Sequence, residues 1–478
     1  MISIKKNFVY NLLLTVSTIL FPIVSFPYAS RILGPEGIGK VQFVTTFAQY
    51  FVLIAAFGIP IYGLREVAKV KDDKHKLSKL FSELLLINLV STIFILIIYF
   101  LIIYLVGFFS NDLLFYLIGA IIIFFSFTSV DWLFSGIEEF RYITLRSLVI
   151  KAISVIALFV FVKTREDLLT YLIITIFSIS GNNIWNFFHL SNRITFLFKN
   201  LNFKRHLPVL LTLFITSMAT SIYTVMDTLF LGFLSDDMSV GFYTAAIKLN
   251  KIAIPVIVSL GIVLIPKITQ SMTLKDGGVT LQELTNRSFS FICLLGVPMS
   301  AGLGIYAPEI MLVFSGPEFI DAVPTMRIAS PLILLIGFGH LFGLQLLIPS
   351  GNEKWYLFAT ILGMILSVIL NIILIRLLKD KGAAAATLLG ELVVSFVSYY
   401  FVCIKLRIKF DWRLAFKAFL SSLIFVPIAF FLRNFQIDNA FILIIAVIIS
   451  SFSYFIIQAF LFRENLIRTV FAKYFVKF

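Results

Sequence analysis

The sequence predicts an all-α polytopic membrane protein, and two observations support this fold class. Its 478 residues are 60% hydrophobic and 13% charged, whereas soluble domains are roughly 25% charged. Apolar runs of about 20 residues recur along the whole chain, and each is long enough to cross about 30 Å of hydrocarbon as a helix. A transmembrane barrel would instead show short segments of alternating hydrophobicity.

Fourteen predicted membrane spans follow from the apolar runs between charge clusters. They begin near Phe8, Val41, Phe81, Leu113, Tyr142, Leu168, Val209, Val240, Phe289, Val323, Trp355, Ala383, Leu414 and Phe441. The first run follows Lys5 and Lys6 but is too long for the hydrophobic region of a signal peptide, so we interpret it as a transmembrane helix. Because fourteen is even, both termini are expected on the same side.

The basic residues predict the orientation of the chain. Most of the 39 lysines and arginines lie in connections on the side of the termini, among them the 65–79 loop, Arg141, Arg146 and the 405–417 segment. The positive-inside rule places these connections and both termini in the cytoplasm. Basic charge spread over many short connections indicates orientation signals and anionic headgroup contacts, so no nucleic-acid partner is predicted. The 65–79 loop is compatible with an amphipathic surface helix or a solvated linker.

Polar residues share one face on each of the first two predicted helices. They are Asn11, Thr15, Thr18, Pro22 and Ser25 in the first helix, and Gln42, Thr46 and Gln49 in the second, at steps of three or four residues. Such faces usually mediate helix packing, but two adjoining faces with glutamines favour a wet interior. Gln42 and Gln49 are therefore candidate cavity residues, and Arg31, in the hairpin between the helices, is expected near the outer mouth of the cavity.

A shift of 202 positions carries both polar faces onto the seventh and eighth spans. The matched pairs are Thr18 with Thr220, Pro22 with Thr224, Ser25 with Asp227, Thr46 with Lys248 and Gln49 with Lys251. Six spans separate the copies, which predicts parallel repeats about an axis along the membrane normal. The predicted domains are two six-helix lobes, 1–206 and 207–410, followed at 411–478 by two further helices and a basic cytoplasmic tail.

The second copy places charge inside the membrane. Counted from Val240, Lys248 lies about 12 Å and Lys251 about 16 Å below the outer end of its helix, and Asp227 lies at a similar depth to Lys248, about 10 Å. A lysine at the membrane centre costs about 2.5 to 3.5 kcal/mol on insertion scales, so such residues usually face a cavity or a partner. The three residues are compatible with a buried structural ion pair or with a cationic substrate site tuned by the acid.

Other polar residues inside the predicted spans are weaker candidates. Asp131 and Glu391 are compatible with protonatable coupling groups or with hydrogen-bonded packing residues. Asn182, Asn186 and His189 share one face of the sixth span, and Asn182 is taken as a candidate cavity residue.

The remaining residues point to no metal or cofactor chemistry. Cys293 and Cys403 lie in separate apolar runs and predict buried thiols, not a disulfide or a metal framework. No metal-ligand spacing occurs, and no cofactor is expected. Glu138 and Arg141 are spaced for a surface ion pair.

Three segments have a distinctive sequence. They read Pro-Tyr-Ala-Ser-Arg-Ile-Leu-Gly-Pro-Glu-Gly-Ile-Gly at 27–39, Asp-Trp-Leu-Phe-Ser-Gly-Ile-Glu-Glu-Phe-Arg-Tyr at 131–142 and Ser-Gly-Asn-Glu-Lys at 350–354. The chain resembles, on these segments and over nearly its whole length, the polysaccharide biosynthesis (O-antigen flippase) family. That family belongs to the multidrug/oligosaccharidyl-lipid/polysaccharide exporter superfamily.

The resemblance implies a transporter, not an enzyme. The expected activity is the flipping of undecaprenyl-diphosphate-linked oligosaccharide, for O-antigen, capsule or lipopolysaccharide biosynthesis, from the inner to the outer leaflet of the bacterial cytoplasmic membrane by alternating access. Expected partners are this lipid-linked glycan, membrane lipids, H⁺ or Na⁺ as coupling ion and a glycan polymerase. The alternatives are a multidrug cation antiporter of the same superfamily and a membrane glycan polymerase or ligase.

Overall fold

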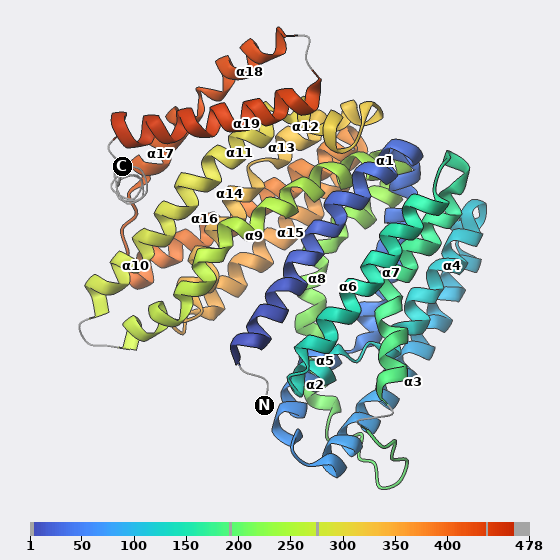
Figure 1. The fold of residues 1–478 in the computed structure, drawn as a ribbon. Coiled ribbons are helices and arrows are strands. Elements are labelled where there is room, and N and C mark those ends of the chain that lie inside the picture. Colours follow the sequence, from blue (N-terminus) through green and yellow to red (C-terminus); the bar gives the residue numbers. More distant parts are fainter. Residues whose placement is uncertain (1–3, 191–193, 274–276, 436–437, 463–478) are drawn as a thin grey trace. The chain divides into compact units, whose positions relative to one another are not determined.

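The computed structural model describes residues 4–190, 194–273, 277–435 and 438–462, which fold into helices and connecting turns without a strand (Figure 1). Twelve helical segments among these residues are long and apolar enough to cross a membrane. The all-α membrane fold class is therefore confirmed. The chain separates into two compact units, Met1–Gly232 and Phe233–Phe478, whereas the predicted domain boundaries at 206 and 410 stay predictions.

Unit 1 contains the first seven α-helices and most of the eighth. They are α1 (Ile4–Ala56), α2 (Ile59–Val70), α3 (Lys74–Leu105), α4 (Leu113–Phe124), α5 (Asp131–Gly136), α6 (Phe140–Phe161), α7 (Leu168–Leu190) and α8 (Leu207–Leu234), with 3₁₀ turns at Gly107–Asp112, Phe125–Thr128 and Arg165–Asp167.

Unit 2 contains the remaining α-helices and several π-helical turns. The α-helices are α9 (Asp237–Thr273), α10 (Gly277–Phe291), α11 (Val297–Ile305), α12 (Ala307–Phe314), α13 (Val323–Ala329), α14 (Leu332–Gly339), α15 (Glu353–Leu378), α16 (Asp380–Leu406), α17 (Trp412–Ser422), α18 (Phe425–Arg433) and α19 (Asn439–Ile456). The π-helical turns are Ile292–Gly296, His340–Leu347 and Ile457–Leu461, and a 3₁₀ turn occupies Pro317–Ala322. Each of the fourteen predicted starting residues lies in a helix, but the number of membrane crossings stays a prediction.

The first helix is broken at Gly34, inside the predicted hairpin. Its φ of 68° lies in the left-handed region that favours glycine, and Pro35 follows it. The start of α1 and helix α2 lie at the same end of unit 1 (Figure 1), so the two legs of α1 run in opposite directions. The shift of 202 carries Gly34 onto Asp236, which lies between the end of α8 and the start of α9. This match supports the predicted repeat, which stays a prediction.

Close packing of α2 on α5 shapes one end of unit 1. Gly63 and Gly136 permit this approach, because a Cβ atom at Gly63 would lie 2.4 Å from the Trp132 ring and one at Gly136 would lie 2.5 Å from Val67. The apolar face of α2 is buried and Arg65 on its other face is exposed. Of the two alternatives for the 65–79 segment, its first part therefore forms an amphipathic helix.

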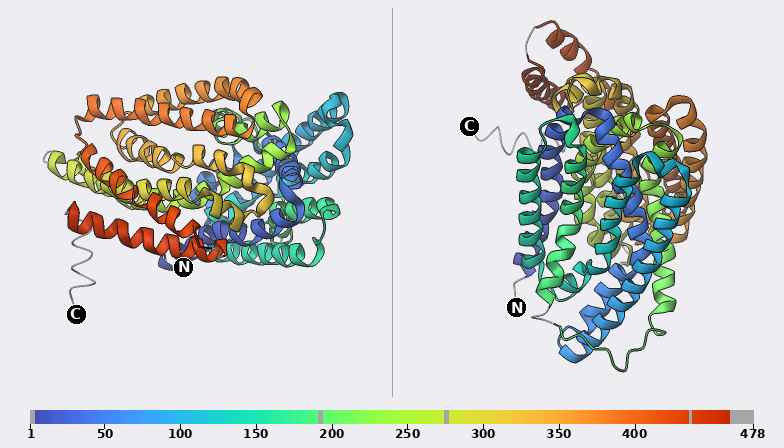
Figure 2. Two further views of the ribbon diagram at one scale, coloured as in Figure 1. Left: turned by 90° about the horizontal axis from the view of Figure 1, so that it is seen from above. Right: turned by 90° about the vertical axis from the view of Figure 1, so that its right-hand side faces the viewer.

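In unit 2, α15 and α16 run side by side as a hairpin (Figure 2). The turn lies at Lys379, and a Cβ atom at Gly363 of α15 would lie 2.8 Å from the Gly390 carbonyl oxygen of α16. Small residues at this contact let the two backbones approach closely, as is typical of membrane helices. The helices α17 and α18 pack on α11 and α19 packs on α12, and the buried residues of this region include Phe425 and Tyr454.

Candidate functional site

A buried arginine holds together three helices of unit 1. Arg146 of α6 forms an ion pair with Asp131 at the start of α5, with Arg146 Nη1 3.0 Å from Asp131 Oδ1. Its Nη2 donates to Asp131 Oδ2 at 3.1 Å, and its Nε donates to Asn182 Oδ1 of α7 at 3.1 Å. Asn186, one turn after Asn182, accepts from Arg146 and donates through Nδ2 to Asp131 Oδ1 at 2.8 Å. The structure thus brings together the predicted residues Asp131 and Asn182.

The two charged side chains of this cluster differ strongly in their exposure. The Arg146 side chain is 2% exposed, whereas the Asp131 side chain is 47% exposed. A buried guanidinium is tolerated only where its donors are satisfied, and here the carboxylate and two amides accept from it. The arrangement can therefore hold a positive charge within unit 1 while presenting a carboxylate at its surface.

The polar face of the sixth predicted span contacts α6, and the role of Asn182 as a cavity residue stays a prediction. Asn182 and Asn186 both bind Arg146, and the His189 ring stacks on Tyr142 of α6 with centroids 4.0 Å apart. The Tyr142 hydroxyl donates to Asn186 Oδ1 at 3.3 Å. Spacing along α7 predicts this shared face, because residues four apart lie on one side of a helix.

Two sequence-based assignments in this region are wrong. Arg146 does not lie in a cytoplasmic connection, because α6 begins at Phe140 and the Arg146 side chain is buried within unit 1. Glu138 pairs with Lys71 across the α2–α5 packing, with Lys71 Nζ 2.7 Å from its Oε1, instead of with Arg141. Glu138 has a φ of 63° and precedes α6, so the helical spacing assumed for the pair does not exist.

The two predicted lysines lie one turn apart in α9 of unit 2. Lys248 is half-buried, Lys251 is exposed, and their ammonium groups interact electrostatically. This placement puts two positive charges on one segment of a membrane helix. Asp227 is buried in α8 and belongs to unit 1, so its proposed pairing with the lysines stays a prediction. The side chains of Thr220 and Thr224 lie outside the described residues.

The remaining predicted site residues lie on α1 and α16. Arg31 is exposed and its Nη1 donates to the Pro27 carbonyl oxygen at 3.0 Å. Gln42 is half-buried and donates to Thr46 Oγ1 at 2.9 Å, whereas Gln49 is exposed.

Glu391 is half-buried in α16 and close enough to Tyr356 of α15 to interact with it electrostatically. Among the described residues, no group of three or more His, Cys, Asp and Glu side chains is placed to hold a metal ion.

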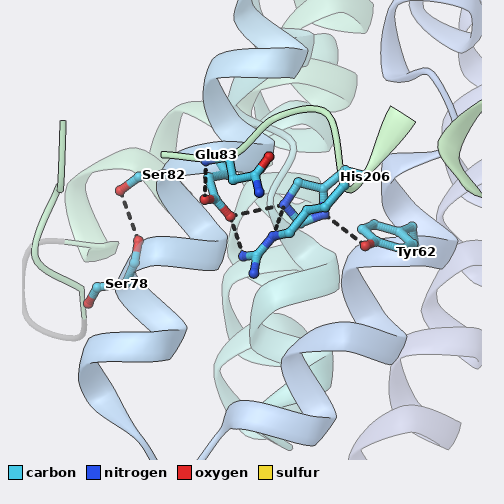
Figure 3. Close-up of polar contacts among 7 residues, drawn as sticks. Tyr62, Ser78, Ser82, Glu83 and His206 are labelled. Atoms are coloured by element: carbon cyan, nitrogen blue, oxygen red, sulfur yellow. Dashed lines mark hydrogen bonds and ion pairs between the residues drawn. The ribbon is translucent and has the colours of Figure 1, made fainter. Parts of the chain in front are cut away.

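Glu83, a buried carboxylate of unit 1, is not among the site residues that the sequence predicts (Figure 3). Glu83 of α3 is fully buried and accepts from the side chains of Arg205 and His206 in the segment that leads into α8. An ionised carboxylate only accepts hydrogen bonds, so His206 Nε2 donates to Glu83 Oε2 at 2.9 Å. His206 Nδ1 lies 2.7 Å from the Tyr62 hydroxyl of α2. Burial raises the pKa of Tyr62, and the Glu66 carboxylate adds to this rise, so Tyr62 stays neutral.

Three acceptors on one face of α3 hold the segment between α7 and α8. The backbone N–H groups of Thr195 and Leu197 donate to Ser78 Oγ and Ser82 Oγ, at 3.2 and 3.0 Å, and that of Asn202 donates to Glu83 Oε1 at 2.7 Å. The segment from 194 to 206 is therefore anchored to unit 1. The available sequence signal was a lone carboxylate at the start of an apolar run, which does not identify its partners.

One family model matches more than half of the chain. A model of the polysaccharide biosynthesis protein family matches residues 4–272. A protein of Escherichia coli strain K12 named "Putative O-antigen transporter" is 26% identical over 418 residues, which are 84% of this chain and 97% of that protein. The "Probable low-salt glycan biosynthesis flippase Agl15" of Haloferax volcanii is 26% identical over 218 residues, 45% of each chain.

Solved structures show the same fold. The inward closed conformation of lipid II flippase MurJ is similar with a TM-score of 0.77 and 15% identity, covering 96% of this chain and all of that one. An inward-facing multidrug resistance MATE transporter is similar with a TM-score of 0.59 and 13% identity, over 81% of this chain and 94% of the other. At these identities the similarity describes the fold alone.

Proposed function

This chain belongs to the polysaccharide biosynthesis protein family, and from that premise we propose that it is a flippase for lipid-linked oligosaccharides. Its cargo is an undecaprenyl-diphosphate-linked repeat unit, moved from the inner to the outer leaflet of the bacterial cytoplasmic membrane. The names of the Escherichia coli and Haloferax volcanii relatives support this class of cargo. The multi-pass helical fold supports a transporter instead of an enzyme.

The observation that carries the proposal is the lysine pair on α9. Lys248 and Lys251 place two positive charges one turn apart inside a membrane helix, and Lys251 is exposed. Moving a diphosphate through a medium of low dielectric constant is costly, and charge-assisted hydrogen bonds from lysines offset part of that cost. A cationic drug would be repelled by the same pair, which favours the flippase over the multidrug antiporter.

The remaining roles follow from this cargo. The polyprenyl tail stays in lipid while the diphosphate and sugars cross the membrane by alternating access. In this proposal Arg31, Gln42, Gln49 and Asn182 line the polar path. Asp227, Asp131 and Glu391 are the candidate groups for coupling to H⁺ or Na⁺, and a glycan polymerase receives the flipped unit. Both termini lie in the cytoplasm.

Deletion of the gene, followed by chemical analysis of lipid-linked intermediates, tests the function. We expect undecaprenyl-linked repeat units to accumulate in the cytoplasmic leaflet. Single units that reach the outer leaflet but stay unpolymerised would instead identify a polymerase. Unchanged glycan together with increased drug sensitivity would identify the multidrug antiporter.

The cationic site is tested in the same strain with a Lys248→Ala, Lys251→Ala double variant. We expect export of the glycan to fall at least about tenfold, because both positive charges are lost. Lys267→Ala is the matched control, since Lys267 is an exposed lysine of the same helix. Full export by a double variant that inserts at wild-type levels would remove the lysine pair from the mechanism.

A further inference from the structure

The end of the α15–α16 hairpin opposite its turn carries two exposed lysines. Lys354 lies at the start of α15 and Lys405 near the end of α16. Each is about 25 residues from the turn at Lys379, so the two helices bring them to the same level. The positive-inside rule predicts that this end faces the cytoplasm.

Both lysines contact the same tryptophan. Lys354 Nζ lies 5.5 Å and Lys405 Nζ lies 5.3 Å from the centroid of the Trp355 ring. The two ammonium groups are therefore no more than about 11 Å apart. On its other contact Trp355 stacks on Phe401 of α16, with centroids 4.3 Å apart and rings inclined by 24°.

This pair of charges has no acidic partner in the part of the chain that the structure describes. No ion pair joins either lysine to an Asp or Glu side chain of those residues, in contrast to Lys71 and Lys379, which pair with Glu138 and Asp236. Two cations at one ring repel each other. An anion placed between them relieves this repulsion.

The surface next to the lysines is apolar and exposed. Leu357 is 57% exposed, Phe358 51% and Ile404 50%, and they lie within one turn of the lysines along the two helices. Exposed apolar side chains on a membrane helix lie against lipid, whereas tryptophan and lysine at its end lie at headgroup level. The cations thus stand where the phosphates of the inner leaflet are.

We propose that this end of the hairpin binds an anionic phospholipid of the inner leaflet. Lys354 and Lys405 hold the phosphate between them, Trp355 and Phe401 contact the glycerol region, and the acyl chains follow the apolar surface of α15 and α16. The cytoplasmic leaflet is rich in anionic lipid, and lysines near its surface attract that lipid. The proposal depends on the orientation in the membrane and not on the flippase function.

Native mass spectrometry of the purified full-length protein tests this site, with phosphatidylglycerol and phosphatidylcholine as probes. We expect the wild type to prefer phosphatidylglycerol, and a Lys354→Gln, Lys405→Gln variant to bind it about tenfold more weakly. Lys354→Arg, Lys405→Arg keeps both charges and should keep the preference. Lys199→Gln, Lys204→Gln is the control, because it removes two exposed lysines elsewhere on the predicted cytoplasmic side.

Three results would overturn the proposal. One is an unchanged preference for phosphatidylglycerol in the glutamine variant, and another is an equal loss in the Lys199, Lys204 control. The third is displacement of phosphatidylglycerol by equimolar undecaprenyl diphosphate, which would assign the site to the transport substrate. If the double variant does not fold, the single Lys405→Gln variant, expected to weaken binding about threefold, replaces it.

Discussion

The side chain of Arg146 connects three helices of unit 1. Its guanidinium is buried and is neutralised by one carboxylate, while two asparagine amides accept its remaining bonds. Continuum estimates indicate that such a pair adds little net stability compared with apolar residues, but that loss of one partner leaves a buried charge or polar group without compensation. The cluster is therefore sensitive to substitution at one side.

We predict that Arg146→Met lowers the free energy of unfolding by about 1 to 3 kcal/mol, because the amide oxygens of Asn182 and Asn186 lose a donor, whereas Asp131 is half-exposed and can bind water. Thermal unfolding of the purified protein in detergent measures this as a fall in Tm. Arg141→Met is the control, since Arg141 is exposed on the same helix. Equal Tm values for the two variants would show that the buried contacts of Arg146 add no measurable stability.

At the scale of elements, glycines decide how closely the helices of unit 1 pack. A Cβ atom at Gly63 would lie 2.4 and 2.6 Å from two carbons of the Trp132 ring, so α2 and α5 touch at this point. Trp132 follows Asp131 directly, and a shift of α5 would displace the carboxylate that pairs with Arg146.

We therefore expect Gly63→Ala to destabilise the protein by about 1 to 3 kcal/mol, the usual cost of overpacking, and to lower Tm. Gly302→Ala provides the comparison, because Gly302 lies in helix α11 with no atom within 4 Å of the added Cβ. That control should keep or raise Tm through better helix propensity. A Gly63→Ala variant as stable as Gly302→Ala would contradict the tight contact.

An ion pair whose strength depends on pH joins the turn between α15 and α16 to the turn that precedes α9. Lys379 Nζ, between α15 and α16, lies 2.7 Å from Asp236 Oδ2, between α8 and α9. Burial alone would raise the pKa of Asp236, but hydrogen bonds from Lys379 and Ser239 outweigh it and hold the pKa below its usual range.

An acid whose pKa is lowered on folding stabilises the protein above its unfolded pKa, and that stabilisation is lost as pH falls through the folded pKa. Wild type should thus have a higher Tm than Asp236→Asn at pH 5 to 7, and the difference should shrink below about pH 4. Scans over this range measure it, with Asp321→Asn as the exposed control. A Tm difference that grows as the pH falls would show that folding raises the pKa of Asp236 instead of lowering it.

For the whole molecule, orientation in the membrane links the fold to the proposed transport. The connection between α2 and α3 is predicted to lie in the cytoplasm, and the 3₁₀ turn Pro317–Ala322 is predicted to lie outside. The depth of the α9 lysines in the membrane and the leaflet of the phospholipid site both depend on this orientation.

We expect Asp321→Cys to react with a membrane-impermeant maleimide on intact cells, and Asp72→Cys to react only after the membrane is opened. Both positions follow from the distribution of basic residues. The native Cys293 and Cys403 are replaced by serine beforehand, and that cysteine-free protein serves as the background. Labelling of Asp72→Cys on intact cells would reverse the orientation.

Local sequence features predict the helical membrane class, the helix-containing segments and the hairpin within 27–39. They also predict the shared face of Asn182 and Asn186, because hydrophobic length, periodicity and glycine or proline position are properties of neighbouring residues. They do not reveal the contacts of Arg146, Glu83 or Trp355.

Those contacts depend on residues that are distant in the sequence. In the sequence Arg146 is typical of an orientation signal, because its acceptors lie on α5 and α7. Glu83 is typical of an isolated acid, because its partner His206 lies more than 100 residues away. Lys354 and Lys405 share a ring only because α15 and α16 form a hairpin. Periodicity states which face of a helix is polar, but the helix that meets this face is set by packing across the whole chain.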